Sequence, residues 1–522
     1  MQSRFASAGG MVAVLCAALL GGARASAQSP VVQEPAELLR AFEESVTQTI
    51  TRVEPSVVAI SRRPRPAEAD KNELGREAGG SVDNNGLETP FSGGDPFRQL
   101  RDQDQLPQPF VSGAGVVIDR AGLVLTQYLV VKPGEEHYVT TTSGDTLPAK
   151  LVAADPRSSL AVLRIESAGA KASEFKPIEF GKAELLRKGA FVVVVGNPYS
   201  IQQDGQATAS YGTVTNLASS APPLENLNNA AVTDRSDAEK YRSTLHHFGS
   251  LIQTDARLGW SASGGAMVTL DGKLVGLTTT VATIAGHEKP AGYAIPINKT
   301  MRRVIEDLKQ GREVEYGLLG IRFDQNAMQL LSDGSEGVAV GAVIPGSAAD
   351  RAGLRANDVI AEIDGQRIDS PDRLQLEVGS LTPGAEAPLI FERNGRPQST
   401  DVRLDKIYVV GKKVITNRPP PWQGLQVDYA TALARPDLAD SQEMIDPQGC
   451  VVVAEVEPGS VSWKRGVRAG MFISHVSGQR VSTPEEFRRA VREAHGNVKL
   501  RFTAGNGPPD ARPVEQDPNE VN

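Results

Sequence analysis

The stretch that decides the fold runs from Ile252 to Met267 and reads I-Q-T-D-A-R-L-G-W-S-A-S-G-G-A-M. Its beginning is apolar and strand-like, and Ser263 is followed by two glycines. Glycines let the backbone turn sharply, so that a serine hydroxyl and several N–H groups can face one point. This is the geometry of a serine nucleophile beside an oxyanion hole. Because Ser-Gly-Gly by itself is common, the meaning of this stretch depends on what else the chain contains.

Length and composition indicate several β-rich domains. The chain has 522 residues, which suggests about three domains rather than one core. Its 51 glycines, 34 prolines and 5% aromatic residues favour many turns and short strands. The net charge of −8 and the isoelectric point near 5.5 argue against nucleic acid or an anionic membrane as the main partner.

Residues 1–27 predict a secretory signal peptide. Arg4 precedes the apolar run Met11–Leu20, which is too short to span a bilayer, and Ala25-Ser26-Ala27 is an A-x-A-type cleavage site. An uncleaved anchor is the alternative. Without the signal the only cysteine is Cys450, which excludes an intramolecular disulfide and a cysteine-based metal site. Cys450 lies in the apolar run C-V-V-V-A and is expected to be a buried thiol.

The first half of the mature chain predicts a helix, a strand-rich domain and a second helix. Residues 35–54 place Leu39, Phe42 and Val46 at helical spacing, so this amphipathic face needs a partner. From Gly113 onward, short apolar runs alternate with turn residues, which is typical of antiparallel barrels. Loops 62–110 and 216–245 are polar and aperiodic, and are either functional or disordered. The expected strands are 57–60, 115–119, 123–126, 137–140, 149–153, 160–165, 191–195, 211–215, 274–278 and 292–296, followed by a helix over 298–309.

The C-terminal third contains an internal repeat. Six positions recur at a constant spacing of 113 residues, which indicates two copies of one module. Each copy is expected to combine short strands with a helix, near 372–378 and 485–493. The copies are joined by a linker near 412–421 whose Pro419-Pro420-Pro421 predicts a stiff spacer. The pairs are Pro345 and Pro458, Gly353 and Gly466, Arg355 and Arg468, Gly365 and Gly478, Arg367 and Arg480, and Pro371 and Pro484.

A signal peptide, a serine-protease-like β domain and two repeated modules, in this order, resemble the HtrA (Deg) family. The resemblance implies a mainly β protein: a chymotrypsin-like double six-stranded β-barrel followed by two α+β PDZ-like domains. It implies a protease-like domain over 36–310, PDZ-like domains over 315–405 and 420–505, and a disordered tail over 506–522. The matching motifs are Gly113–Asp119, Leu125-Thr126, Asp155-Pro156, Leu160–Leu163, Gly196-Asn197-Pro198, Ile252–Ala256, Ser263-Gly264-Gly265 and Gly292–Pro296.

Two members of the catalytic triad are replaced. The family motif L-T-N-x-H-V-V reads L-T-Q-Y-L-V-V here, so the position of the histidine base is Leu129. The motif D-P-x-x-D-L-A-V-L reads D-P-R-S-S-L-A-V-L, so the position of the orienting aspartate is Ser159. The nucleophile position, Ser263, is retained. In serine proteases the loss of the histidine alone costs on the order of a million-fold in kcat. The resemblance therefore predicts a pseudoprotease.

The oxyanion hole is also altered. By resemblance it would be formed at Ser261, Ala262 and Ser263, and Ser261 stands where the family has a glycine. Ser-Gly-Gly also suits a sharp turn for steric reasons alone, so the retained Ser263 does not require residual catalysis. A register shift that rescues the base is not expected, because both flanking strands align without gaps.

No other base is evident in the sequence. His137 lies on the strand after the lost histidine and should face elsewhere. His246 and His247 precede the nucleophile strand, where at most one of two adjacent strand residues could face the cleft. Each is expected to be a surface or partly buried loop histidine. A serine–lysine arrangement is conceivable, but no lysine is placed by the sequence. No metal site and no cofactor are expected.

The two PDZ-like modules predict peptide binding by strand addition. This mode needs a free strand edge, backbone N–H groups for a terminal carboxylate and an apolar pocket. The second module departs from the pattern because Gln423 stands at an apolar position. The alternative is that the modules only pack against the barrel or other subunits. The residues expected to bind are Leu318, Leu319, Gly320 and Ile321 in the first module, and Gln423, Gly424 and Leu425 in the second.

The favoured function is that of a periplasmic or secreted protein of protein quality control without catalytic activity. It would bind unfolded proteins or C-terminal peptides as a chaperone, adaptor or regulatory subunit, with no integral membrane segment after signal cleavage. The alternative is an active serine endopeptidase that uses Ser263 with an unorthodox base. A third hypothesis is a scaffold whose barrel mainly forms oligomers. The resemblance implies a homo-oligomer, a trimer assembled through N-terminal segments, with or without active paralogues.

Overall fold

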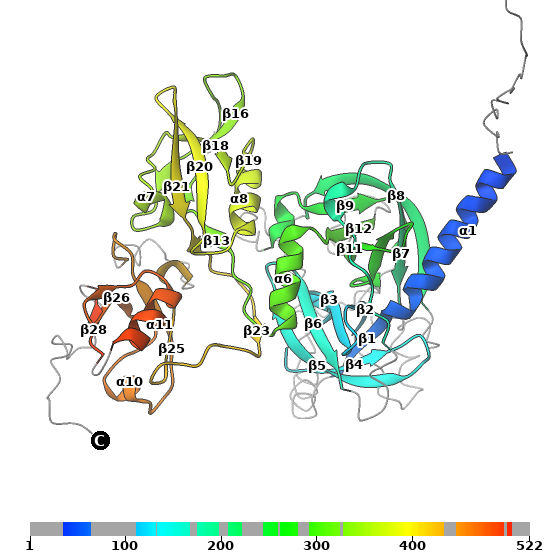
Figure 1. Cartoon of the computed structure of the whole chain (residues 1–522), viewed down its shortest axis with the longest axis horizontal. Helices are drawn as coiled ribbons and strands as arrows, with labels where there is room; N and C mark the ends of the chain where they lie inside the picture. The colour runs from blue at the N-terminus through cyan, green and yellow to red at the C-terminus, as the bar shows by residue number, and fades with distance from the viewer. Residues whose placement is uncertain are drawn as a thin grey trace, which may run out of the picture. The chain divides into compact units, whose positions relative to one another are not determined.

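The computed structural model describes most of the chain between residues 35 and 503 (Figure 1). The predicted signal peptide, the tail after 503 and most of the predicted loops 62–110 and 216–245 lie outside the described residues. The chain divides into two compact units, Met1–Ser45 and Val46–Asn522. The described ranges are 35–63, 111–131, 133–166, 175–197, 207–221, 244–258, 262–279, 292–323, 327–432, 445–494 and 498–503.

Helix α1 (Pro35–Val53) is amphipathic, as its spacing predicts. Near its N-terminus Leu39 is 70% exposed, whereas Val46 and Val53 are buried. The C-terminal end is fixed by polar contacts, including an Arg52 Nη1 to Asp271 carbonyl bond of 2.9 Å. None of the helices in the described part of the chain is both long and apolar enough to cross a membrane.

The first barrel is a closed antiparallel sheet of six strands. The order is β5-β4-β1-β2-β3-β6, and a further β5–β6 pairing closes it. Apolar side chains such as Ile60, Val124 and Leu163 alternate into its core. The strands are β1 (Val57–Arg63), β2 (Val111–Val117), β3 (Leu123–Gln127), β4 (Glu136–Thr140), β5 (Thr146–Asp155) and β6 (Leu160–Ile165).

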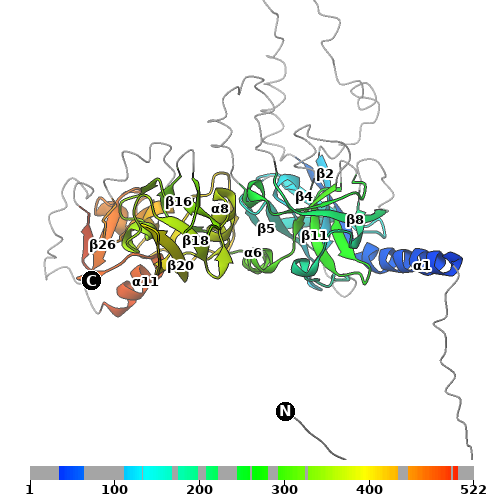
Figure 2. The same cartoon turned by 90° about the horizontal axis from the view of Figure 1, so that it is seen from above.

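The second barrel is closed in the order β10-β11-β12-β9-β8-β7. Val192, Ile252 and Met267 lie in its core. Helix α6 (Lys299–Lys309) follows, capped by the Asn298 side chain, which accepts the Met301 N–H at 2.9 Å. α6 packs against β5 and β6 (Figure 2). The strands are β7 (Phe191–Gly196), β8 (Thr208–Ser219), β9 (Leu251–Thr254), β10 (Ala266–Thr269), β11 (Leu274–Thr279) and β12 (Gly292–Pro296).

The first PDZ-like module, called the first module below, has a main sheet in the order β15-β16-β18-β20-β21, with β19 on β18. Ile360, Leu374 and Leu389 belong to its core. Its elements are β13 (Gly317–Leu318), β14 (Ile321–Arg322), β15 (Met328–Leu330), β16 (Glu336–Ala339), β17 (Ala342–Val343), α7 (Ala348–Arg351), β18 (Val359–Ile363), β19 (Gln366–Arg367), α8 (Pro371–Ser380), β20 (Glu386–Arg393), β21 (Arg396–Arg403) and β22 (Asp405–Lys406).

The second module repeats this plan, with strand order β24-β25-β26-β27 and β28 on β26. Helices α7 and α10, and likewise α8 and α11, begin 113 residues apart, which is the spacing of the sequence repeat. The fold class predicted from the sequence is confirmed. Its elements are β24 (Leu425–Tyr429), the 3₁₀ turn η6 (Ala430–Ala432), β25 (Val451–Val456), α10 (Val461–Lys464), β26 (Phe472–Val476), β27 (Gln479–Arg480), α11 (Pro484–Glu493) and β28 (Leu500–Phe502).

The linker between the modules is not simply a spacer. Its residues Val414–Ile415 form strand β23, which pairs with Ala154 and Ala153 of β5 and so extends the first barrel's sheet. Thr416 Oγ1 adds a 2.8 Å bond to the Val152 carbonyl. The prediction of a stiff spacer from Pro419-Pro420-Pro421 was incomplete because it did not include β23. A two-residue strand has almost no periodic pattern in the sequence and is stabilised only by the strand with which it pairs.

Candidate functional site

Ser263 lies in a tight turn between β9 and β10, as its two glycines predict. The residue is 8% exposed, and Gly264 has φ of +88°. A Cβ at Gly264 would clash with the Ala114 carbonyl, so glycine is required for two independent reasons. The Ser263 carbonyl accepts the Ala114 N–H at 2.8 Å, and the Gly264 N–H donates to the Thr278 carbonyl at 2.8 Å. The turn is therefore fixed to β2 of one barrel and β11 of the other.

The oxyanion-hole positions are only partly described. Ala262 and Ser263 are buried, and the Ala262 carbonyl accepts the Gly265 N–H at 3.0 Å and a hydrogen bond from the Thr278 hydroxyl. Ser261 lies outside the described residues. The assignment of these three positions to an oxyanion hole stays a prediction.

Leu129 occupies the 3₁₀ turn η2 (Tyr128–Val130) that follows β3. Its side chain is 44% exposed. The next residue, Val130, lies close to Gly113: a Cβ at Gly113 would clash with the Val130 methyl groups and lie 3.1 Å from the Ser263 carbonyl oxygen. The turn that carries Leu129 and the turn that carries Ser263 thus flank the same point on β2. A leucine at this point has no group that could accept a proton.

Ser159 ends the loop between β5 and β6. It is buried and has φ of +57°, a left-handed conformation unusual for a residue other than glycine, asparagine or aspartate. Its carbonyl accepts the Tyr128 N–H at 2.9 Å, which joins this loop to the η2 turn. The structure therefore brings the segments of Leu129, Ser159 and Ser263 into one neighbourhood.

The carboxylate that remains in this loop, Asp155, is engaged elsewhere. Its Oδ2 accepts the Ser158 N–H at 2.8 Å, the Ser158 hydroxyl at 2.7 Å and the hydroxyl of Tyr316. The Arg157 guanidinium lies over the Tyr316 ring, 5.5 Å from its centroid. Burial, and then the charge of Asp155, raise the pKa of Tyr316 well above its usual range. Tyr316 directly precedes β13, so the loop between β5 and β6 contacts the start of the first module.

The expectation for His246 and His247 was wrong in one respect: both are buried, on the 3₁₀ turn η4 (Leu245–Phe248) rather than on a strand or exposed loop. His246 Nε2 lies 2.8 Å from the Ser158 carbonyl and Nδ1 lies 2.8 Å from Ser250 Oγ. Because a carbonyl only accepts, Nε2 carries the proton and Nδ1 accepts. Burial lowers the pKa of His246 to about 4. The sequence around His246 does not predict this burial, because the residues that pack over the ring come from distant elements.

The other two candidate bases are also committed to local structure. His247 Nδ1 accepts the Thr244 N–H at 3.1 Å as part of a capping box. His137 is buried on β4, where burial lowers its pKa and its charged neighbours are Glu135 and Arg62. Within the described residues, no group of three or more His, Cys, Asp or Glu side chains could hold a metal ion. Cys450 is buried, and burial raises the pKa of its thiol to about 11.

The predicted peptide-binding residues lie at the entrance of each module. In the first module Leu319 is buried in the core, and Gly320 has φ of +83°. In the second module Gln423 is exposed, while Gly424 and Leu425 are buried. Gln423 has φ of +50°, a left-handed backbone conformation.

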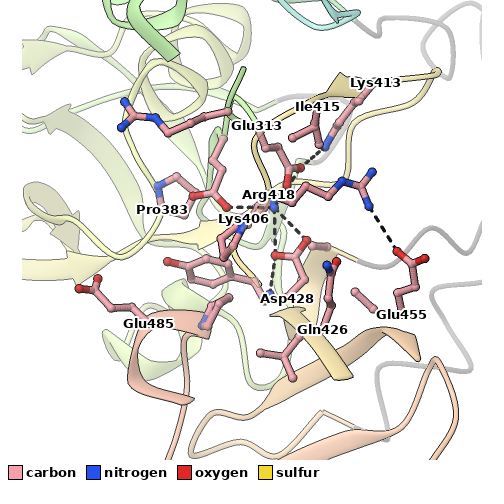
Figure 3. A pocket seen from close by; sticks show the side chains of 18 of the residues that line it. Glu313, Pro383, Lys406, Lys413, Ile415, Arg418, Gln426, Asp428, Glu455 and Glu485 are labelled. Atoms are coloured by element: carbon pink, nitrogen blue, oxygen red, sulfur yellow. Dashed lines mark hydrogen bonds and ion pairs between the residues drawn. The ribbon is translucent and has the colours of Figure 1, made fainter. Parts of the chain in front are cut away.

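Sequence reasoning missed a polar cavity of about 870 Å³ along β24, α11 and the linker (Figure 3). Lys406 is at its centre, 2% exposed, with Nζ 2.8 Å from Asp428, 3.0 Å from Glu315 and 3.1 Å from Glu313. Burial alone would lower the Lys406 pKa, but these carboxylates raise it above its ordinary value. No sequence pattern connects these four positions, because they come from three separate segments.

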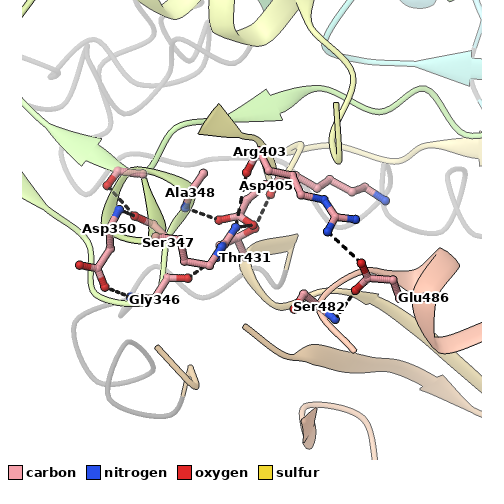
Figure 4. A network of polar contacts seen from close by, with 12 residues as sticks. Gly346, Ser347, Ala348, Asp350, Arg403, Asp405, Thr431, Ser482 and Glu486 are labelled. Atoms are coloured by element: carbon pink, nitrogen blue, oxygen red, sulfur yellow. Dashed lines mark hydrogen bonds and ion pairs between the residues drawn. The ribbon is translucent and has the colours of Figure 1, made fainter. Parts of the chain in front are cut away.

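A second polar network joins the two modules (Figure 4). Asp405 accepts the Ala348 N–H at 2.7 Å and forms an ion pair with Arg351 at 2.6 Å. Burial raises the pKa of the Asp405 carboxyl. Arg403 of the first module pairs with Glu486 of α11 at 2.8 Å.

Comparison with known proteins agrees with this architecture. Residues 113–277 match the trypsin-like peptidase domain, and residues 317–404 match the PDZ domain. The periplasmic pH-dependent serine endoprotease DegQ of Escherichia coli (strain K12) is 29% identical over 409 residues, which cover 77% of this chain and 80% of DegQ. A probable periplasmic serine endoprotease, DegP-like, of Chlamydia pneumoniae is 26% identical over 512 residues, 94% of each chain.

Among solved structures, the HtrA-type protease AlgW with decapeptide is 23% identical to this chain, with a TM-score of 0.44. The match covers 72% of this chain and 99% of AlgW, and this likeness is too low to support an inference. Both of these curated relatives are named periplasmic. The trypsin-like peptidase and PDZ matches, in this order and with DegQ and DegP-like relatives, support the resemblance of the chain to the HtrA (Deg) family.

Proposed function

We propose that this protein is a non-catalytic HtrA family member that binds unfolded proteins or C-terminal peptides as a chaperone, adaptor or regulatory subunit of protein quality control. The observation that carries the proposal is Leu129, which stands on the η2 turn beside the Ser263 turn, where the family has its histidine base. Its relatives are named serine endoproteases, so the proposal concerns what this chain has lost.

The chemistry of serine nucleophiles supports this view. A serine hydroxyl without a neighbouring base is a poor nucleophile at neutral pH. Leu129 cannot accept a proton, and Ser159 cannot orient or charge-stabilise an imidazole as a carboxylate does. His246, the buried histidine bonded to the adjacent Ser158, is held neutral with both ring nitrogens engaged. Ser263 retains a steric role in its turn, which explains its presence without catalysis.

The peptide-binding part of the proposal rests on the first module. Residues 317–404 match the PDZ domain, a class that binds extended peptides by adding a strand to a sheet edge. Backbone N–H groups near Leu318–Ile321 would hold the terminal carboxylate. Assembly as a homo-oligomer, a trimer by family resemblance, with or without active paralogues, belongs to the same proposal.

A serine-directed fluorophosphonate probe tests the loss of catalysis. The purified mature protein should show no labelling at Ser263 beyond that of Ser263→Ala, and no cleavage of an unfolded substrate. Because a missing histidine costs on the order of a million-fold in kcat, even slow specific labelling would be informative. Labelling that disappears in Ser263→Ala would favour the alternative, an active endopeptidase with an unorthodox base.

A restored triad provides the positive control. Leu129→His with Ser159→Asp, combined with Ser261→Gly for the family's oxyanion glycine, reintroduces the lost groups. Aspartate tolerates the positive φ of position 159, so the backbone need not change. This variant should label at Ser263 while the wild-type chain does not. A chaperone assay on both proteins, following aggregation of an unfolded substrate, then tests binding separately from cleavage.

A further inference from the structure

The entrance loops of the two modules have equivalent residues, which the structure identifies independently of sequence similarity. Gly320 O accepts the Ile344 N–H at 2.9 Å in the first module, and Gly424 O accepts the Glu457 N–H at 2.8 Å in the second. The next residues, Ile321 and Leu425, pair with Val343 and Val456. The donors Ile344 and Glu457 are 113 residues apart, which is the repeat spacing. The strand partners Val343 and Val456 are separated by the same number. Leu318 and Trp422, three residues before Ile321 and Leu425, are therefore equivalent.

These two equivalent residues are placed differently. In the first module Leu318 belongs to β13 and pairs with Asp405 of β22. In the second module Trp422 folds back onto its own strand: the Leu425 N–H donates to the Trp422 carbonyl at 2.8 Å, and the Trp422 N–H donates to the Leu425 carbonyl at 2.9 Å. Both residues of the intervening turn have positive φ, +50° at Gln423 and +79° at Gly424. This is a closed two-residue turn of type I′.

The Trp422 side chain lies on the groove side of the second module. Its ring meets the Phe487 ring of α11 edge to face, with centroids 6.0 Å apart. Trp422 is half-buried and packs against the module's apolar core. The cavity along β24 and α11 begins beside it, and its lining includes Gln426 and Glu485 (Figure 3). Trp422 thus combines a backbone pairing to β24 with an aromatic contact to the facing helix.

A peptide that adds to a PDZ strand makes the same two contacts. It pairs with the strand edge through its backbone, and its terminal side chain enters an apolar pocket against the helix, while backbone N–H groups hold its carboxylate. At the end of β24 the Leu425 amide is already bonded to Trp422, and the indole ring occupies the space against Phe487.

We propose that Trp422 is a built-in occupant of the second module's groove and excludes C-terminal carboxylates from it. The proposal rests on the proposed peptide-binding function and assigns that function to the first module alone. The wild-type chain therefore binds one C-terminal peptide per chain although it contains two modules.

Calorimetric titration of the full mature chain with a short peptide ending in a free valine carboxylate tests this inference. The wild type should bind one equivalent per chain. Trp422→Ala removes the occupant and should bind a second equivalent, whereas Trp422→Phe keeps an aromatic ring in the groove and should stay at one. The same peptide with a C-terminal amide distinguishes carboxylate recognition from other binding, and should not gain a second site in any variant.

A second pair of variants opens the groove without removing the tryptophan. A β-branched residue is strongly disfavoured at positive φ, so Gln423→Ile should open the turn and add the second equivalent. Gln423→Asn tolerates positive φ and should behave as the wild type. This pair guards against the possibility that Trp422→Ala simply unfolds the module, which circular dichroism of each variant reports.

The outcomes separate the inference from the proposed function. Two equivalents in the wild type would overturn the inference and leave peptide binding intact. No binding to the wild type together with one equivalent in Trp422→Ala would support the inference and contradict binding by the first module. If folded Trp422→Ala and Gln423→Ile both bind no more peptide than the wild type, Trp422 is a packing residue and the inference is wrong.

Discussion

His246 illustrates how burial and two hydrogen bonds fix the charge of a histidine. It lies next to the loop that carries Ser159, its Nε2–H is bonded to the Ser158 carbonyl, and its ring is buried. In an active site a histidine needs a pKa near the working pH and access to the nucleophile. Here burial lowers the pKa to about 4, so the imidazole is a neutral structural group.

This predicts a pH-dependent stability. The His246 pKa is about 6.5 in the unfolded chain and about 4 in the folded one, so between these values the unfolded state binds more protons. The stabilisation that neutral His246 contributes is fully present above pH 6.5 and is lost as the pH falls toward 4. The free energy of unfolding decreases by roughly 3 kcal/mol in total over this range. Urea titrations at pH 7 and pH 5 should show a larger difference for the wild type than for His246→Gln.

His137 is also buried with a lowered pKa, so it too makes the folded protein less stable as the pH falls. The variant His246→Gln should therefore reduce the pH dependence of stability rather than abolish it. His475→Gln, at a more exposed histidine, is the matched control and should keep most of the slope. Equal pH dependence in wild type and His246→Gln would show that His246 is protonated in the folded protein.

Among the elements, β23 best illustrates stability that depends on a partner. Two residues cannot form a strand alone, but Val414 and Ile415 pair with β5, and the Lys412 carbonyl accepts the Tyr128 hydroxyl at 3.1 Å. Lys413 adds an ion pair to Glu313 at 2.7 Å. The linker between the modules is thereby held along the first barrel, beside the loop that carries Ser159.

Replacing Ile415 with proline should release this linker. Proline fixes φ at about −65°, well away from the φ of about −140° of an antiparallel strand, which is unfavourable for the pairing of Ile415 with Ala153. Trypsin should then cleave after Lys412 and Lys413 several-fold faster in Ile415→Pro than in the wild type. Val410→Pro, at an exposed position of the same linker outside β23, is the control and should leave the cleavage rate unchanged. Equal rates in both variants would mean that β23 contributes nothing to the protection of the linker.

At the scale of the molecule, Lys406 joins carboxylates from two other segments of the chain. One buried ammonium group compensates Glu313 and Glu315, which follow α6, and Asp428 on β24. Buried ion pairs are weak evidence of stabilisation, because desolvation offsets much of the attraction. Removing the cation is nevertheless costly, since Glu315 and Asp428 lose this partner while Glu313 keeps only its pair with Lys413. Lys406 therefore couples the first module, the segment before it and the second module.

The variant Lys406→Met should lower the free energy of unfolding by about 3–5 kcal/mol. It retains the apolar stem, so the loss comes from the three carboxylates rather than from a cavity. The matched control is Lys309→Met, which removes a partly exposed pair with Glu306 and should cost less than about 1 kcal/mol. Urea titration followed by circular dichroism measures both. Similar costs would contradict a central role for Lys406.

Much of the fold was readable from the sequence, because it depends on local patterns. The strands 160–165 and 292–296 are bounded by turn residues and have the predicted limits, and the 113-residue repeat reappears in the helix starts. The sharp turn after Ser263 follows from two glycines, one of which no other residue could replace. The assignment of Leu129 and Ser159 to the two replaced triad positions also comes from the sequence alone and stays a prediction.

The tertiary structure decided the properties that depend on distant partners. The burial of His246, the pairing of β23 with β5, and the three carboxylates around Lys406 each join segments far apart in the chain, which no periodicity can report. The same holds for Trp422. Its residue type stands in the sequence, but only the folded module places it between β24 and Phe487. The sequence determined which residues are present and which strands form; three-dimensional packing determined which of those residues meet, and hence their charge, exposure and function.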